Sequence, residues 1–182
     1  FVSSEIKPNN TINIRPGLRF IKNSVYSAPP VIPSINSKFT LYNNFDFRVA
    51  YAYGFRSPAL RELYYNFVDA NHIIVGNPHL KAEHSSSFNG SLSCTLPKTK
   101  QGHQNVITLS SFYNTFNNLI NYATSPTSTD TTITVNIDKY KTTGIMIEDK
   151  LQSKNFTASL GFSYIGRYNQ LADAEGFKNE NL

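Results

Sequence analysis

Apolar and polar side chains alternate with a period of two along most of this chain. From Phe45 to Tyr53 the odd positions carry large apolar side chains and the even positions carry polar or small ones. Successive residues of a β-strand point to opposite faces of the sheet, so this pattern predicts a strand with one apolar and one polar face. The chain is therefore expected to be all-β and antiparallel.

Seven segments follow this alternation and are predicted as strands. They cover residues 11–22, 31–42, 45–54, 84–96, 104–121, 131–151 and 155–168. Short connections alternate with longer ones, and the connection 55–83 is by far the longest. Asn43-Asn44 suits a tight turn, because Asn tolerates a positive φ. Tight turns at one end of antiparallel strands and long loops at the other are typical of outer-membrane β-barrels.

One stretch departs from the alternation. Lys139, Lys141 and Thr143 interrupt the apolar row of the segment 131–151. A β-bulge would produce this interruption, and so would an exit of the strand from the apolar zone. The sequence leaves both explanations open.

The polar faces have an unusual composition. Asn, Ser and Thr together make up 55 of 182 residues, while charged residues make up only 16%, against roughly 25% in soluble domains. A soluble β-sandwich buries two apolar faces against each other and exposes a charged surface. The composition therefore favours strands of a transmembrane barrel. A soluble β-sandwich that binds a glycan or a protein ligand is the alternative.

Several features indicate that the chain is a piece of a larger barrel. Bacterial barrels have an even number of strands, because an open sheet edge in lipid leaves backbone groups unpaired. Seven strands do not meet this rule, and the chain begins at Phe1 rather than Met. No apolar run approaches the roughly 20 residues of a membrane helix. The single cysteine, Cys94, excludes a disulfide framework.

Charge and motifs argue against other classes of protein. The net charge is +5, but the Lys and Arg residues are scattered instead of forming one stripe, so no nucleic-acid partner is expected. No Ser/His/Asp or Cys/His constellation and no phosphate-binding glycine loop occurs. We therefore expect no catalytic residues and no enzyme.

Two boxes flank the long connection. The run GFRSPALRELYY extends from Gly54 to Tyr65, and the run GNPHLKAE extends from Gly76 to Glu83. Together with the order of the strands over residues 31–165, they resemble the TonB-dependent outer-membrane receptor family. That family usually carries an acidic residue two positions after the glycine that corresponds to Gly144. This chain has Met146 there instead, with Glu148 on the same face.

The resemblance implies a fragment of a 22-stranded barrel in the bacterial outer membrane, with residues 1–182 forming part of the barrel and the plug domain absent. It implies active import of a scarce nutrient such as an iron–siderophore complex, haem or cobalamin. The implied partners are TonB, which acts through the absent plug, outer-membrane lipid and the small nutrient. A passive porin-type barrel is a further alternative. No cofactor is expected, and haem enters only as possible cargo.

Most of the box residues are expected to shape the long connection. Ser57 is predicted to cap a short helix that begins at Pro58, and Arg56 is predicted to pair with Glu62 across this turn. The structural motif is Gly54, Phe55, Arg56, Pro58, Glu62, Leu63, Tyr64, Gly76, Asn77, Pro78, Leu80 and Glu83.

A smaller set could contact the transported ligand. In haem-uptake members of the family a histidine lies between the two boxes, and His72 holds that place here. Imidazole and phenolate groups can both ligate haem iron. The candidate ligand-binding residues are His72, Tyr64, Tyr65, Arg56 and His79. Asp69, His72, His79, Glu83 and His84 could suggest a metal cluster, but their spacing matches no recurring metal-ligand pattern, so no metal site is expected.

Overall fold

The structure is a computed structural model that describes residues 1–42, 44–70 and 73–169. All of its strands belong to one 11-stranded sheet. The elements are β1 (Val2–Ser3), β2 (Ile6–Asn9), β3 (Ile12–Phe20), β4 (Val31–Tyr42), β5 (Phe45–Arg56), α1 (Leu60–Tyr64), β6 (Asn66–Val68), β7 (Ile73–Val75), β8 (Glu83–Thr95), β9 (Gln104–Ser125), β10 (Ser128–Gln152) and β11 (Thr157–Asn169).

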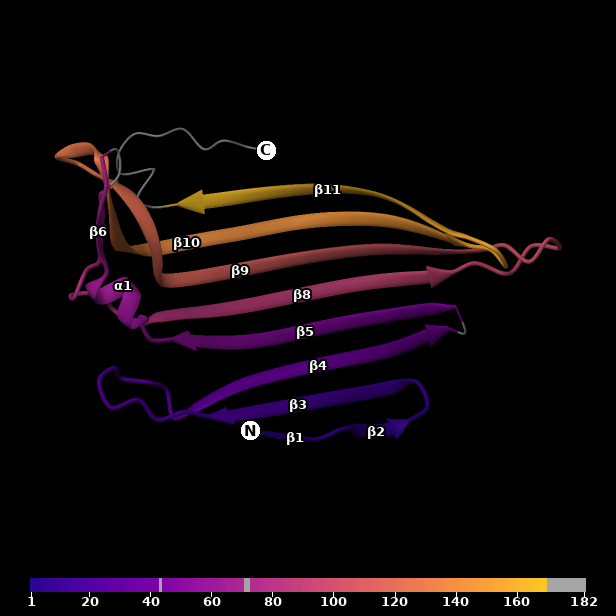
Figure 1. The fold of residues 1–182 in the computed structure, drawn as a ribbon. Coiled ribbons are helices and arrows are strands. Elements are labelled where there is room, and N and C mark those ends of the chain that lie inside the picture. Colours follow the sequence, from indigo (N-terminus) through magenta and orange to yellow (C-terminus); the bar gives the residue numbers. More distant parts are fainter. Residues whose placement is uncertain (43, 71–72, 170–182) are drawn as a thin grey trace.

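The long strands β3, β4, β5, β8, β9, β10 and β11 lie side by side and pair antiparallel with their neighbours (Figure 1). Their ends differ by a few residues from the segments that the alternation predicts. The turns that join β8 to β9 and β10 to β11 lie at one end of the sheet. At the other end lie α1, β6 and the tips of β9 and β10.

The pairing register sorts the side chains into two faces. Arg48 pairs with Ser91, and Ser91 pairs with Ser110, so these polar residues form one row on one face. The next row, on the opposite face, contains Val49 and Ile145. We call the face that contains Arg48 the concave face, because a hollow described below opens on it, and the opposite face the convex face.

The convex face has no protein partner among the described residues. Leu160 and Phe162 on this face are 80% and 70% exposed, and Ile145 is 58% exposed. A sandwich would cover such residues with a second sheet. The described strands form one sheet only, so the soluble sandwich is not the architecture of this chain.

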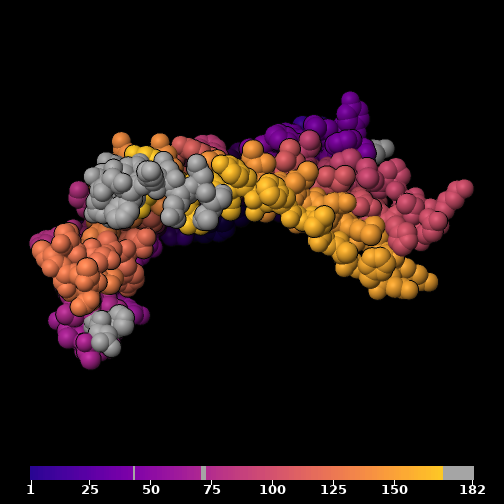
Figure 2. Space-filling view, turned by 90° about the horizontal axis from the view of Figure 1, so that it is seen from above, coloured from indigo at the N-terminus to yellow at the C-terminus, as the bar shows by residue number. Residues whose placement is uncertain are grey.

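The sheet is curved, and one end of it bends sharply. Figure 2 shows the tip of the β9–β10 hairpin and the adjoining β6 as an arm that projects from the curved body. One cluster of buried apolar residues lies near this bend and consists of Leu63, Leu80 and Ile120. Among the described residues, no helix is long and apolar enough to span a bilayer.

Two expectations need correction or refinement. The connection 55–83, expected to be a long extracellular loop with one short helix, contains the strands β6 and β7 as well as the helix α1. The pairing of β10 with β9 keeps one register from Thr132 to Gln152, so no bulge lies at Lys139, Lys141 and Thr143. The remaining explanation is that the strand leaves the apolar zone there.

Candidate functional site

The chain between β5 and β8 folds into a compact unit, of which residues 57–70 and 73–82 are described. We call these residues the roof segment. Its helix α1 begins at Leu60 with Ala59 as N-cap, not at Pro58 with Ser57 as cap. The reason is that Glu62 accepts a hydrogen bond from the backbone N–H of Ala59 through Oε2 at 2.7 Å. A carboxylate at the third helical position thus supplies the cap that Ser57 was expected to provide.

Arg56 links this helix to the sheet through two carboxylates. Its Nη1 donates to Oε1 and Oε2 of Glu62 at 2.8 and 2.9 Å, and its Nη2 donates to Oε2 of Glu83 at 3.1 Å. Glu83 also accepts a bond from the backbone N–H of Ile120 at 3.1 Å. The predicted Arg56–Glu62 pair is therefore confirmed, as part of a larger network that joins β5, α1, β8 and β9.

The two carboxylates favour the charged form of Arg56. Arg56 is the last residue of β5 and lies beyond the apolar band of that strand, which runs from Phe45 to Tyr53 over about 26 Å at 3.3 Å per residue. Partial burial alone would lower the pKa of the guanidinium. The hydrogen bonds to Glu62 and Glu83 outweigh that effect and raise the pKa of Arg56 above its ordinary value.

The second box closes onto the end of α1. The backbone N–H of Gly76 donates to the carbonyl of Tyr65 at 2.6 Å, and that of Asn77 donates to the carbonyl of Glu62 at 2.9 Å. A Cβ on Gly76 would lie 2.8 Å from the carbonyl carbon of Leu63. Only glycine permits this approach of two backbones, which gives Gly76 a direct structural role.

Asparagine side chains fasten the roof segment to β10. Asn136 accepts a bond from the N–H of Lys81 at 2.7 Å, and its Nδ2 donates to the carbonyls of Lys81 and Asn118 at 3.1 and 2.8 Å. Asn77 donates to the carbonyl of Thr134 at 3.1 Å. The bonds of Asn77 and Lys81 to β10 join residues that lie more than fifty positions apart in the chain.

The roof segment crosses the concave face. It leaves β5 and returns to β8, yet β7 pairs in parallel with Thr131–Ile133 of β10, beyond β9. The sheet side chains that anchor it, Arg56, Glu83 and Asn136, have the same parity as the concave-face residues of their strands. The segment therefore covers one end of the concave face.

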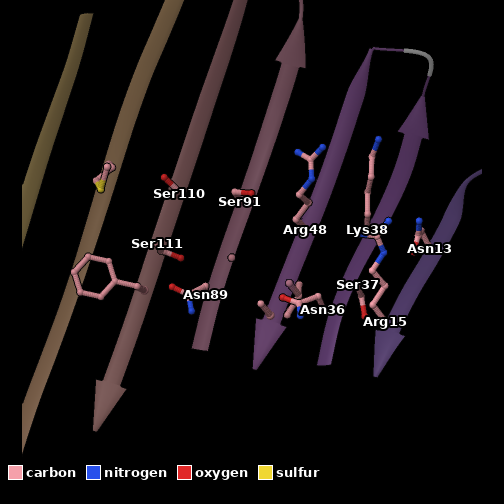
Figure 3. Close-up of a pocket in the computed structure, with 15 residues that line it drawn as sticks. Asn13, Arg15, Asn36, Ser37, Lys38, Arg48, Asn89, Ser91, Ser110 and Ser111 are labelled. Carbon is pink, nitrogen blue, oxygen red and sulfur yellow. The ribbon is translucent and has the colours of Figure 1, made fainter. Parts of the chain in front are cut away.

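Below the roof segment, the concave face forms an open hollow of about 720 Å³. Figure 3 shows that polar and basic side chains of neighbouring strands project into it. The labelled residues with the parity of the concave face are Asn13, Arg15, Asn36, Lys38, Arg48, Asn89, Ser91 and Ser110, and Ser37 and Ser111 of the other parity also border the hollow.

The basic side chains of the hollow are partly neutralised. Arg15 contacts Glu5 at 2.7 Å, while Lys38 and Arg48 contact the same carboxylate of Asp46 at 3.1 and 3.5 Å. These residues are 30–62% exposed at the side chain. Polar and charged side chains thus share the lining of the hollow with the apolar side chains of Phe112 and Met146.

The predicted ligand-contact residues are only partly brought together. Arg56 is engaged by two carboxylates, and the ring of Tyr65 lies under the guanidinium of Arg61 at 4.7 Å. Tyr64 is 68% exposed, and His79 is also exposed. His72 lies outside the described residues. Ligand contact by any of these side chains stays a prediction.

Sequence reasoning missed some of the residues that hold the site. Asn136 organises the roof segment through bonds to β9 and to Lys81, although nothing in its local sequence marks it as a long-range contact. Arg15 and Lys38 were not identified as lining a hollow. Among residues 1–42, 44–70 and 73–169, no three His, Cys, Asp or Glu side chains come together as a metal site.

A family profile decides the identity of the fold. The profile described as "TonB dependent receptor-like, beta-barrel" matches residues 1–181. The chain belongs to this family. Receptors of the family lie in the outer membrane, as expected from the sequence, and neither they nor the neighbours below are enzymes.

Solved structures of receptor barrels share the fold. The siderophore receptor PirA from Pseudomonas aeruginosa has a TM-score of 0.71 at 20% identity, and the match covers 91% of this chain and 33% of PirA. A double mutant of the Serratia marcescens hemophore receptor HasR, solved with its hemophore HasA and heme, gives 0.67 at 15% identity, covering 85% and 31%. A mutant of the ferric enterobactin receptor PfeA from Pseudomonas aeruginosa gives 0.61 at 18% identity, covering 92% and 26%.

This receptor-barrel chain therefore spans about a third of the length of PirA and HasR. No relative among the curated proteins matches it.

Proposed function

We propose that this chain forms part of the barrel wall and of the extracellular loop set of a TonB-dependent active transporter. The cargo is a scarce nutrient of the class of iron–siderophore complexes, haem or cobalamin. In this proposal the convex face contacts lipid and the concave face lines the lumen. TonB acts on a plug domain that this chain does not contain.

The observation that carries the proposal is the roof segment over the concave face. It is fixed to β5 by the ion pair of Arg56 with Glu62 and to β10 by the bonds of Asn77 and Asn136, and in this proposal it stands at the mouth of the lumen. A loop anchored in this way can present exposed side chains such as Tyr64 to an incoming ligand while its base stays in place. The polar and charged side chains in the hollow below it suit a lumen that holds a plug or passes a polar ligand.

The transporter proposal differs from a passive porin in one measurable respect. Active import through the full-length protein requires TonB, whereas diffusion through a pore does not. Uptake of radiolabelled ferric siderophore, haem or cobalamin should occur in cells that carry the protein and TonB, and should be lost when tonB is deleted. Uptake that persists without TonB would overturn active transport in favour of the porin.

Haem is the more specific cargo hypothesis, supported by the position of His72 between the two boxes and by likeness to a receptor solved with heme. Titration of the full-length protein with haem tests it. His72→Ala is expected to weaken binding and to change the absorption spectrum of the iron, because imidazole is an axial ligand. His103→Ala, in the turn between β8 and β9 at the opposite end of the sheet, is the matched control. Unchanged affinity and spectrum in His72→Ala would remove the haem hypothesis and leave import of another nutrient untouched.

A further inference from the structure

Two rows of the convex face contain lysines, which the rows below them lack. They lie at the end of the sheet that carries the roof segment, and we call them the rim rows. The first contains Tyr53, Ser86, Thr115, Lys141 and Tyr168. The second contains Phe55, His84, Asn117 and Lys139.

The rim rows begin where the apolar band ends. On β10 the convex positions Ile145 and Ile147 are apolar and exposed, and Thr143 separates them from Lys141. Four residues of strand, about 13 Å, separate Ile145 from Lys141. The two lysines that interrupt the alternation of the sequence are therefore the first charged groups above the apolar zone on this strand.

The charge of the rim rows has one sign. Lys139 and Lys141 are exposed, and the two rows contain no Asp or Glu. Within the described part of the chain, neither lysine has a carboxylate within ion-pair distance. The ammonium nitrogen of Lys141 lies 5.8 Å from the centre of the Tyr168 ring, so the aromatic face supports the charged group.

Aromatic and hydroxyl groups complete this surface. The hydroxyl of Tyr53 lies 2.9 Å from Nδ1 of His84, and the His84 ring packs edge-on against Phe55 at 5.3 Å. Aromatic side chains of this kind are enriched at the level of lipid headgroups. The hydroxyls of Ser86 and Thr115 lie between the aromatic side and the lysines and are suitable donors to phosphate.

The opposite border of the apolar band has the other sign. There the convex face carries Asp149, whose two carboxylate oxygens accept bonds from Asn105 at 2.9 Å. The cations of the convex face on β8 to β11 thus lie at the roof end and not at the turn end. A general attraction to water would not require this asymmetry.

We propose that the rim rows bind the phosphorylated headgroup of a lipid in the outer leaflet of the membrane. This inference rests on the proposed function, because it takes the convex face as lipid-facing and the roof end as extracellular. Lys139 and Lys141 stand about 6.6 Å apart along β10, so both ammonium groups reach one headgroup. The aromatic side chains lie at the level where acyl chains meet the headgroup, and the hydroxyls donate to phosphate oxygens.

The test measures lipid binding by the full-length receptor in detergent. Native mass spectrometry follows the uptake of bis-phosphorylated lipid A, with dephosphorylated lipid A and inorganic phosphate as further arms. We expect Lys139→Gln combined with Lys141→Gln to weaken binding of the phosphorylated lipid about tenfold. The matched control is Lys98→Gln combined with Lys100→Gln, two exposed lysines with the same spacing in the turn at the other end, and it should bind like wild type.

Equal binding in the rim variant, equal weakening in both variants, or equal binding of the dephosphorylated lipid would overturn the proposal. Full competition by inorganic phosphate would identify a free-anion site instead of a lipid site, and would also overturn it. TonB-dependent uptake measured on the same variants separates the two proposals. If uptake is intact while lipid binding does not depend on the two lysines, the lipid-site proposal is wrong and the transporter proposal is unaffected.

Discussion

The long strands and the roof segment keep their apolar side chains in opposite environments. On the strands, Leu160 and Ile145 are 80% and 58% exposed, whereas Leu63 and Leu80 of the roof segment are 8% and 3% exposed. The strands are joined mainly by backbone hydrogen bonds between neighbouring strands. The roof segment is held by an ion-pair network and by hydrogen bonds of asparagine side chains. The exposed strands therefore need partners outside this chain, which in the proposed function are lipid and further strands, whereas contacts within this chain stabilise the roof segment.

The largest expected effect comes from placing a charge on the convex face. Leu109→Arg should destabilise the folded receptor in bilayers by about 2–4 kcal/mol, because an Arg near the midplane of a lipid-facing strand is poorly solvated. Ser110→Arg, on the next residue and the concave face, is the matched control and should change stability far less. Unfolding in urea from lipid vesicles measures both. Equal losses would erase the difference between the two faces.

A smaller effect is expected inside the roof segment at Gly76. Gly76→Ala should cost about 2 kcal/mol, because the new Cβ would meet the backbone of Leu63 at 2.8 Å and neither backbone can yield easily. Gly90→Ala is the control, since its Cβ would lie 3.6 Å from the Ser111 hydroxyl, an ordinary contact. Limited proteolysis of residues 57–82 in the full-length receptor measures how readily the roof segment opens. If the control is cleaved equally fast, the close approach at Gly76 has no special role.

The ion-pair network should contribute somewhat less, because Arg56 is 43% exposed at its side chain. Arg56→Met leaves Glu62 and Glu83 without their cation, and we expect a loss of about 1.5 kcal/mol after allowance for solvent screening. Arg56→Lys should restore only part of it, because one ammonium group cannot reproduce the two-nitrogen bridge. Thermal unfolding and proteolysis of the roof segment are the readouts. A lysine variant as weak as the methionine variant would show that charge alone has no role here.

The smallest effect is expected at Asn136, which bonds the backbone of the roof segment, in comparison with Asn114, which bonds side chains within the sheet. Asn136→Ala should cost about 1 kcal/mol, because Lys81 loses partners for both its N–H and its carbonyl. Asn114→Ala is the comparison within the sheet, where Asn114 bonds only the side chains of Ser87 and Thr142. Asn136→Ala should speed hydrogen exchange at residues 79–82, and Asn114→Ala should leave it unchanged. Faster exchange at residues 79–82 in both variants would contradict a specific role of Asn136 in holding the roof segment.

Period-two alternation was enough to predict the long strands and their two faces, because it follows directly from strand geometry. The row that contains Arg48 and the row that contains Val49 lie on opposite faces, as the sequence indicates. The two lysines at 139 and 141 were recognised as a break in the pattern. Only the continuous register of β10 decided between a bulge and an exit from the apolar zone.

The roof segment could not be predicted to the same extent, because its contacts are not local. The parallel pairing of β7 with β10 joins residues nearly sixty positions apart, and no periodicity encodes it. The predicted cap of α1 was wrong for a local reason. The Glu62 carboxylate, and not the Ser57 hydroxyl, accepts the hydrogen bond of the Ala59 N–H at the start of the helix. The spacing of Ala59 and Glu62 carries the signal of an acidic third helical residue, which sequence reasoning did not use.

An accessibility scan along β9 tests most directly whether the convex face contacts lipid and the concave face contacts water. Single cysteines at positions 107–114 of the full-length receptor in bilayers would carry spin labels, with Cys94 replaced by Ser and any other cysteines removed. We expect labels at odd positions to collide with oxygen dissolved in lipid, and labels at even positions to collide with a water-soluble nickel complex. Loss of this alternation, or protection of both sets from both reagents, would contradict a sheet with lipid on its convex face and water on its concave face.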